Sequence, residues 1–76
     1  MEEKIIAILN GINEDIESYT GTNMMADEII DSFELIEIIS QLEDTFDIEI
    51  DAAEVSVENF ANKDSIITLV KQLIDQ

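Results

Sequence analysis

One serine stands out because of the residues around it. Ser32 lies in the sequence Asp31–Ser32–Phe33–Glu34, directly before a helical run of apolar residues. Asp31 occupies the position of a helix N-cap, and Glu34 follows three residues later, as in a capping box. This spacing places Ser32 in the first turn of a helix, beside unpaired backbone N–H groups and the positive end of the helix dipole. A phosphate ester on its hydroxyl would therefore be well placed.

Apart from this hydroxyl, the chain offers little chemistry of its own. It contains no His and no Cys, so the commonest general base and the commonest strong nucleophile are both missing. Because the only candidate bases near Ser32 in sequence are carboxylates, we expect it to be an acceptor that another enzyme modifies. A cluster of acids further along lacks the spacing and the central glycine of a calcium loop, so no dedicated metal site is predicted. These acids are Asp44, Asp47, Glu49 and Asp51.

The helix that positions Ser32 is predicted over residues 35–45 from the spacing of its apolar residues. Ile30 and Leu35 hold the two positions of a hydrophobic staple, which fixes how the chain enters the helix. Ile36 lies off the main stripe, close to acidic residues, and is either a contact for a partner or a widening of the buried stripe. The stripe itself consists of Ile30, Leu35, Ile38, Ile39, Leu42 and Phe46.

Before this helix, a first helix and a long loop are predicted. Residues 2–17 carry an apolar stripe at helical spacing. Gly11 within it costs roughly 1 kcal/mol relative to Ala and would let another helix approach closely. Residues 18–30 form a connection that is long for so small a domain, and such loops are often functional. Its apolar side chains either line a pocket or pin the loop over the core; they are Tyr19, Met24 and Met25.

After this helix, residues 46–51 alternate apolar and acidic side chains, which predicts an extended connector with the apolar side chains turned inward. Ser56 is predicted to cap a short third helix, and Asp64 to cap the last helix. Together these elements predict an all-α fold. It is a small four-helix bundle with three main helices, one short helix and a long first loop, in a single domain over residues 1–76.

Charge is the strongest feature of the composition, with 19 acids against three lysines and a formal net charge of −16. Nucleic acids and anionic membrane surfaces are recognised by clustered Lys and Arg, so neither is an expected partner. The acids either attract proteins with basic patches or only keep a small apolar domain soluble. No stretch is long enough to span a bilayer and no signal peptide is visible, so a cytoplasmic location is expected.

The sequence around Ser32 resembles the phosphopantetheine attachment motif of acyl carrier proteins, D-S-L followed by an acidic residue and a helix. Asp31–Ser32–Phe33–Glu34–Leu35–Ile36–Glu37 is similar to that motif, and residues 42–50 repeat the family's order of leucine, acids, phenylalanine and isoleucine. The placement of helices over residues 57–74 is also similar. This sequence differs from the family's usual residues at four positions. Phe33 replaces the usual leucine, Asp51 replaces a common proline, and Ile29 and Ile30 replace a glycine and a small residue. These differences bear on the identity of the cargo more than on the attachment of the prosthetic group.

The resemblance implies a non-catalytic carrier protein, expected to be a monomer. Ser32 would receive 4′-phosphopantetheine from coenzyme A through a phosphopantetheinyl transferase, which would make the chain a phosphoprotein. The thiol of the arm would hold an acyl or aminoacyl group as a thioester, for fatty acid, polyketide, nonribosomal peptide or D-alanyl transfer pathways. From a different class, the alternative is an acidic interaction module that never carries a prosthetic group.

The resemblance also implies where partners bind, because the family's second helix is its recognition helix. Its acids would meet basic patches on the loading and transferring enzymes, and two apolar side chains would add contacts. Phe33 has a second interpretation, as a hydrophobic residue that only shields the start of the helix. The implied partner contacts are Asp31, Phe33, Glu34, Ile36, Glu37, Glu43 and Asp44.

Overall fold

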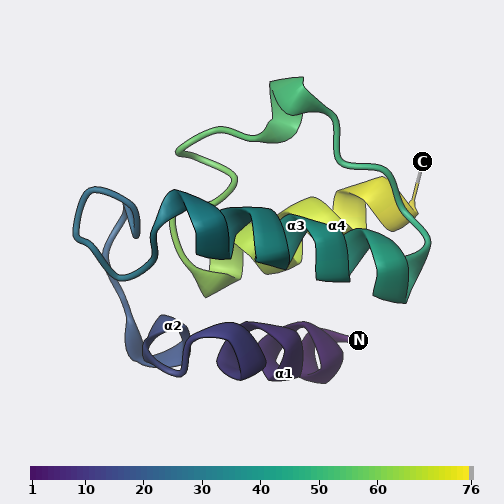
Figure 1. Cartoon of the computed structure of the whole chain (residues 1–76). Coiled ribbons are helices and arrows are strands. Elements are labelled where there is room, and N and C mark those ends of the chain that lie inside the picture. The colour runs from purple at the N-terminus through teal and green to yellow at the C-terminus, as the bar shows by residue number, and fades with distance from the viewer. Residues whose placement is uncertain (76) are drawn as a thin grey trace.

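Three long helices pack side by side in the computed structural model, which describes residues 1–75 (Figure 1). The long helices are α1 (Glu2–Ile12), α3 (Ser32–Phe46) and α4 (Lys63–Ile74), and a short helix α2 (Asp15–Ser18) follows α1. A single 3-10 helix, η1 (Ala52–Glu54), lies in the connection between α3 and α4. No strand is present among the described residues, so the predicted all-α fold is confirmed.

The core forms where the apolar stripes of the long helices meet. Each long helix contributes a pair of fully buried side chains spaced four residues apart, which places both on one face of the helix. Burial of one such side chain stabilises the fold by about 1.5–3 kcal/mol. Helix α1 contacts both α3 and α4, and thereby holds the start of α3 against the rest of the molecule. The three pairs are Ile5 and Leu9, Ile38 and Leu42, and Ile66 and Val70.

The predicted first helix is interrupted at Asn13. There the backbone is extended (φ −157°), and the Asn13 Oδ1 accepts a hydrogen bond from the backbone N–H of Asp15 at 2.9 Å, which starts α2. The prediction of one helix to residue 17 was therefore wrong at this break. The expectation for Gly11 was wrong as well, because a Cβ on Gly11 would meet no atom within 4 Å and no helix approaches it.

Helix α3 is longer than predicted and includes Phe46, which the sequence assigned to an extended connector. Asp47 ends the helix in the left-handed conformation (φ 53°), and the Ile48 N–H donates to the Glu43 carbonyl at 3.3 Å, as in a Schellman motif. The apolar side chains of the segment do turn inward, since Ile50 is buried and Ile48 is partly buried.

Two predictions in the last third of the chain were wrong. Residues 56–60 form turns rather than a helix, although the Ser56 Oγ does accept a hydrogen bond from the Asn59 N–H at 3.2 Å. The cap of α4 is Asn62 instead of Asp64, because the Asn62 side chain accepts from the Ser65 N–H at 3.0 Å. Asp64 lies inside the first turn of α4, where a negative charge still suits the helix dipole.

Replacing Asp47 by glycine is expected to raise the free energy of unfolding by about 0.5–1 kcal/mol. Glycine adopts the left-handed conformation without strain, and the change removes a negative charge from the negative end of the α3 dipole. Urea denaturation of the purified protein measures the change. Asp44→Gly removes the same charge within the helix and is expected to destabilise by a similar amount. Equal effects of the two variants would contradict this account of the helix end.

The start of α1 and the end of α4 lie on the same side of the molecule (Figure 1). There the Lys71 Nζ lies 2.6 Å from the Glu2 Oε2, and this ion pair holds the pKa of Glu2 below its usual value. Because both side chains are exposed, the pair contributes little to stability. It is the one ion pair found in residues 1–75, so no other acid of this strongly negative chain has a lysine partner there.

Candidate functional site

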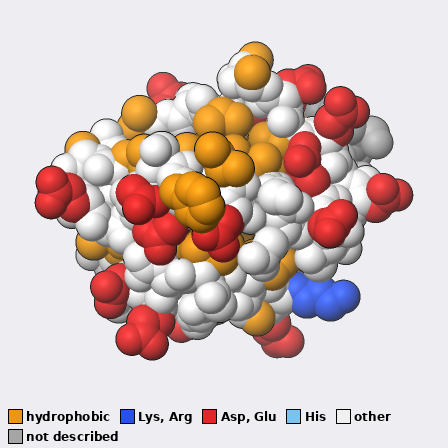
Figure 2. Space-filling model, viewed as in Figure 1, with side chains coloured by type: hydrophobic (Ala, Val, Ile, Leu, Met, Phe, Trp, Pro, Cys, Tyr) orange, Lys and Arg blue, Asp and Glu red, His pale blue; other side chains and the backbone are white. Residues whose placement is uncertain are grey.

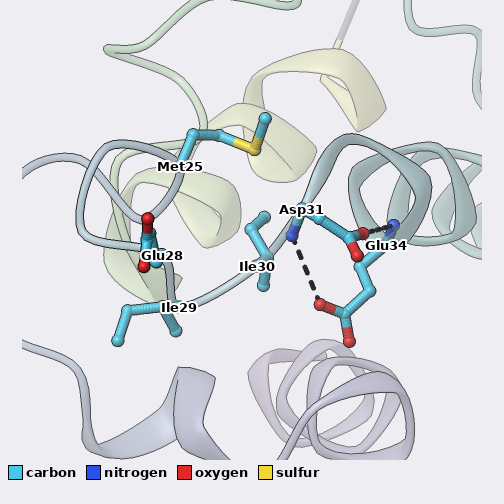
Figure 3. Close-up of a pocket in the computed structure, with 6 residues that line it drawn as sticks. All are labelled: Met25, Glu28, Ile29, Ile30, Asp31 and Glu34. Carbon is cyan, nitrogen blue, oxygen red and sulfur yellow. Dashed lines mark hydrogen bonds between the residues drawn. The ribbon is translucent and has the colours of Figure 1, made fainter.

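Ser32 is the first residue of α3, and its side chain is exposed. The predicted capping box precedes it: the Asp31 Oδ1 accepts from the Glu34 N–H at 2.8 Å, and the Glu34 Oε1 accepts from the Asp31 N–H at 3.3 Å (Figure 3). These two bonds fix the direction in which the chain enters the helix. The Ser32 hydroxyl therefore lies at the positive end of α3 and is open to reagents in solution.

The loop before α3 is anchored by its own side chains. Met24 is fully buried in the core. The Tyr19 hydroxyl donates to the Asp27 Oδ2 at 2.5 Å and accepts from the Asn23 N–H at 2.9 Å. The hydrogen bond to Asp27 is the main reason that the pKa of Tyr19 lies above its usual value. For Tyr19 and Met24, the interpretation that they pin the loop is therefore confirmed.

Met25 faces outward and lines two hollows beside the start of α3. The larger, about 400 Å³, is shallow and has Asp31 and Glu34 in its wall, together with three loop residues (Figure 3). These three are Glu28, Ile29 and Ile30. Met25 therefore lines these hollows, and its contact with a carried group stays a prediction.

The smaller hollow has a volume of about 170 Å³ and lies between α3 and the turns after η1. Its wall is mostly apolar, and its volume is well below the 300–1,000 Å³ typical of sites that enclose a ligand. This hollow is therefore too small to enclose such a ligand, and the larger one beside the start of α3 is shallow. The residues that line the smaller hollow are Asn23, Met25, Leu35, Val55, Ser56, Val57 and Phe60.

Two large apolar side chains project into solvent from α3. Phe33 is 72% exposed, and Ile36, one helical turn later, is 65% exposed. The interpretation of Ile36 as part of the buried stripe was therefore wrong. Figure 2 shows hydrophobic side chains gathered on this face of the molecule with acidic side chains around them. Such a surface is complementary to a partner with an apolar centre and a basic rim.

Of the five acids predicted as partner contacts, Asp31 is exposed and belongs to the capping box, and the other four divide into two kinds. Glu37 and Asp44 are exposed on α3. Glu43 is partly buried, and its Oε2 accepts a hydrogen bond from the Ile50 N–H at 2.9 Å. Glu34 is also partly buried and belongs to the capping box. Glu43 and Glu34 thus stabilise the fold of the chain. For Glu43 this role depends on the hydrogen bond to the Ile50 backbone, which forms only when the chain folds.

Asn13 contacts the site although no sequence pattern indicated it. Its Nδ2 donates to the Ile29 carbonyl at 2.7 Å, three residues before Ser32. The two residues are 16 positions apart, and no local pattern signals a contact over that distance. Asn13 reaches the site because the break between α1 and α2 lies against the end of the long loop.

The described residues hold no group of three or more side chains that could bind a metal ion. Within residues 1–75, none of the helices is both long enough and apolar enough to cross a membrane. The acidic groups around Ser32 are carboxylates that hold backbone N–H groups or face solvent. What this arrangement offers is an accessible hydroxyl at a helix N-terminus.

Comparison with known families identifies the family of the chain. A family model described as the phosphopantetheine attachment site matches residues 3–72. The matched span begins in α1, contains Ser32 and the whole of α3, and extends into α4. No curated protein matches the chain.

Proposed function

The chain belongs to the phosphopantetheine attachment-site family, and from this premise we propose that it is a carrier protein modified at Ser32. The family attaches 4′-phosphopantetheine covalently. The observation that carries the proposal is the exposed Ser32 hydroxyl at the N-terminus of α3, inside the matched span. The charge of the chain, the absence of cysteine and the open surface around Ser32 support it.

The residues at the site suit a phosphodiester. The Ser32 hydroxyl is accessible, and the first turn of α3 presents backbone N–H groups and a positive dipole end that favour the negative charge of a phosphate. None of the hydrogen bonds found among residues 1–75 uses the Ser32 side chain, so attachment breaks no internal contact. When bound, the group supplies a thiol for a thioester, which a chain without cysteine lacks.

Attachment is a phosphoryl transfer in which the chain acts as the nucleophile. The Ser32 oxygen forms a bond to the phosphorus next to pantetheine in coenzyme A, and the bond from that phosphorus to the bridging oxygen breaks. Adenosine 3′,5′-bisphosphate leaves, and the hydroxyl proton passes to a base of the transferase. We assign that base to the transferase because the chain has no His, the commonest general base.

We propose that the partners are a phosphopantetheinyl transferase and the enzymes that load and transfer an acyl or aminoacyl group. The exposed acids Glu37 and Asp44 would attract basic patches, and Phe33 and Ile36 would provide apolar contacts. In this proposal the chain is a monomeric, cytoplasmic, single-domain and non-catalytic carrier. Its cargo belongs to fatty acid, polyketide, nonribosomal peptide or D-alanyl transfer.

The test is to incubate the purified chain with coenzyme A and a promiscuous phosphopantetheinyl transferase. The intact mass should rise by one phosphopantetheine. The number of thiols that a thiol reagent detects should rise from zero to one per chain, because the chain itself has no cysteine. A chain that gains neither mass nor thiol would instead be an acidic interaction module without a prosthetic group. In that case Glu37→Lys, which reverses an exposed charge on α3, should weaken binding to the partner protein, while Ser32→Ala should leave this binding unchanged.

A further inference from the structure

Asn13 connects the break between α1 and α2 to the segment that leads into Ser32. Its Oδ1 accepts from the Asp15 N–H at 2.9 Å, and its Nδ2 donates to the Ile29 carbonyl at 2.7 Å. The segment from Ile29 to Asp31 has no regular structure. The bond to Ile29 therefore holds the chain just before α3 at a point where no helix holds it.

The same Nδ2 also lies beside the capping box. It is 3.4 Å from each carboxylate oxygen of Glu34, and one of these oxygens accepts from the Asp31 N–H. Bonds of this length are weak individually, but together they set the direction of the Glu34 carboxylate. Asn13 thus contacts the chain on both sides of Ser32, at Ile29 before it and at Glu34 after it.

The position of the Ser32 hydroxyl depends on these contacts. Since no hydrogen bond found in residues 1–75 involves the Ser32 side chain, its Oγ is placed by the backbone of the first turn of α3 alone. That turn is held by the capping box, and the Glu34 carboxylate, one of the two carboxylates of the box, is contacted by the Asn13 Nδ2. A loosened turn would have to be ordered again each time an enzyme binds it.

We propose that Asn13 is a positioning residue for the modification of Ser32, an inference that rests on the proposed function. It keeps the first turn of α3 in the one arrangement that the transferase binds. Asparagine suits this role because its amide donates to Ile29 and faces the Glu34 carboxylate while its oxygen starts α2. Aspartate would keep the oxygen but lose the donor and repel Glu34.

The chain contains a closely matched control in Asn62. The Asn62 Oδ1 accepts from the Ser65 N–H at 3.0 Å, and its Nδ2 donates to the Gly21 carbonyl at 2.8 Å. It therefore caps a helix and anchors the same long loop, but at the end away from Ser32. Asn13→Asp and Asn62→Asp each add one negative charge, keep the oxygen that accepts a backbone N–H and lose a donor to a loop carbonyl.

The experiment measures transfer from coenzyme A to the unmodified chain by a promiscuous phosphopantetheinyl transferase. For Asn13→Asp, the KM for the chain is expected to rise about tenfold while kcat stays within twofold. If only about one molecule in ten holds the ordered turn, the apparent affinity falls by that factor. Asn62→Asp is expected to leave both constants within twofold, and Asn13→Gln, which keeps the donor, is expected to recover part of the loss.

Amide hydrogen exchange of the unmodified variants provides a readout that needs no transferase. Exchange at residues 31–35 should be faster in Asn13→Asp than in Asn62→Asp at a temperature where circular dichroism shows both folded. Equal KM values, or equal exchange at these residues, would overturn the role of Asn13. Failure of the wild-type chain to gain phosphopantetheine would overturn the proposed function instead, and the exchange comparison would still test the positioning by Asn13.

Discussion

Ser32→Ala is expected to abolish enzymatic attachment of phosphopantetheine completely while the fold persists. The variant lacks the one oxygen that forms the new bond to phosphorus. Because the side chain is exposed and alanine is a good helix former, the free energy of unfolding should change by no more than about 0.5 kcal/mol. Intact mass after incubation with coenzyme A and transferase measures the attachment, and thermal melting followed by circular dichroism measures the stability.

The matched control for this variant is Ser40→Ala. Ser40 is also exposed and lies on the same helix, but in its middle, away from the free N–H groups and the positive dipole end. This control should gain one phosphopantetheine as the wild type does. A mass gain in Ser32→Ala, or its loss in Ser40→Ala, would show that the attachment point lies elsewhere.

Ile38→Ala is expected to lower the free energy of unfolding by about 2–5 kcal/mol. Ile38 is 0% exposed in the centre of the core, so its loss removes buried apolar surface and leaves a cavity. A single core in a domain of this size rarely supplies more than about 3–5 kcal/mol of stability. The variant should therefore be largely unfolded at 37 °C, which urea denaturation and the circular dichroism signal will measure.

Ile36→Ala is the control, because it makes the same chemical change on the same helix two residues earlier. Ile36 is 65% exposed, so truncation should change stability by no more than about 0.5 kcal/mol. The proposed partner surface predicts a second difference between them: Ile36→Ala should weaken binding to a partner enzyme without unfolding the chain. Equal destabilisation of the two variants would contradict the assignment of the buried and exposed faces of α3.

The contrast between these two isoleucines shows how far the apolar pattern alone can be used. The spacing of Ile38 and Leu42 predicted a buried stripe, and both side chains are buried. Ile36 lies off the main stripe, close to acidic residues, and the sequence allowed either a partner contact or a widening of the buried stripe. A helix has only 3.6 residues per turn, so the edge of a stripe is decided by how closely the neighbouring helices approach.

The helix caps also show which features a local sequence pattern predicts and which depend on the fold. Asp31 and Glu34 form the predicted capping box because both groups belong to one local stretch, and the geometry of one turn suffices to bring them together. By residue type Asp64 was an equally good N-cap, but the N-cap of α4 is Asn62, two residues earlier. The Asn62 side chain also bonds to the Gly21 carbonyl, 41 residues away, so its position in the fold depends on the loop as well as on α4.

The sequence by itself determined the all-α fold, the capped helix start and the position of Ser32 in its first turn. Each of these follows from side chains within a few turns of one another, where helical periodicity and capping act locally. Only the tertiary structure decided that Asn13 contacts Ile29, that Glu43 bonds to the Ile50 backbone, and that Ile36 faces solvent. These depend on which surfaces meet when the helices pack, and packing joins residues whose separation along the chain carries no local signal.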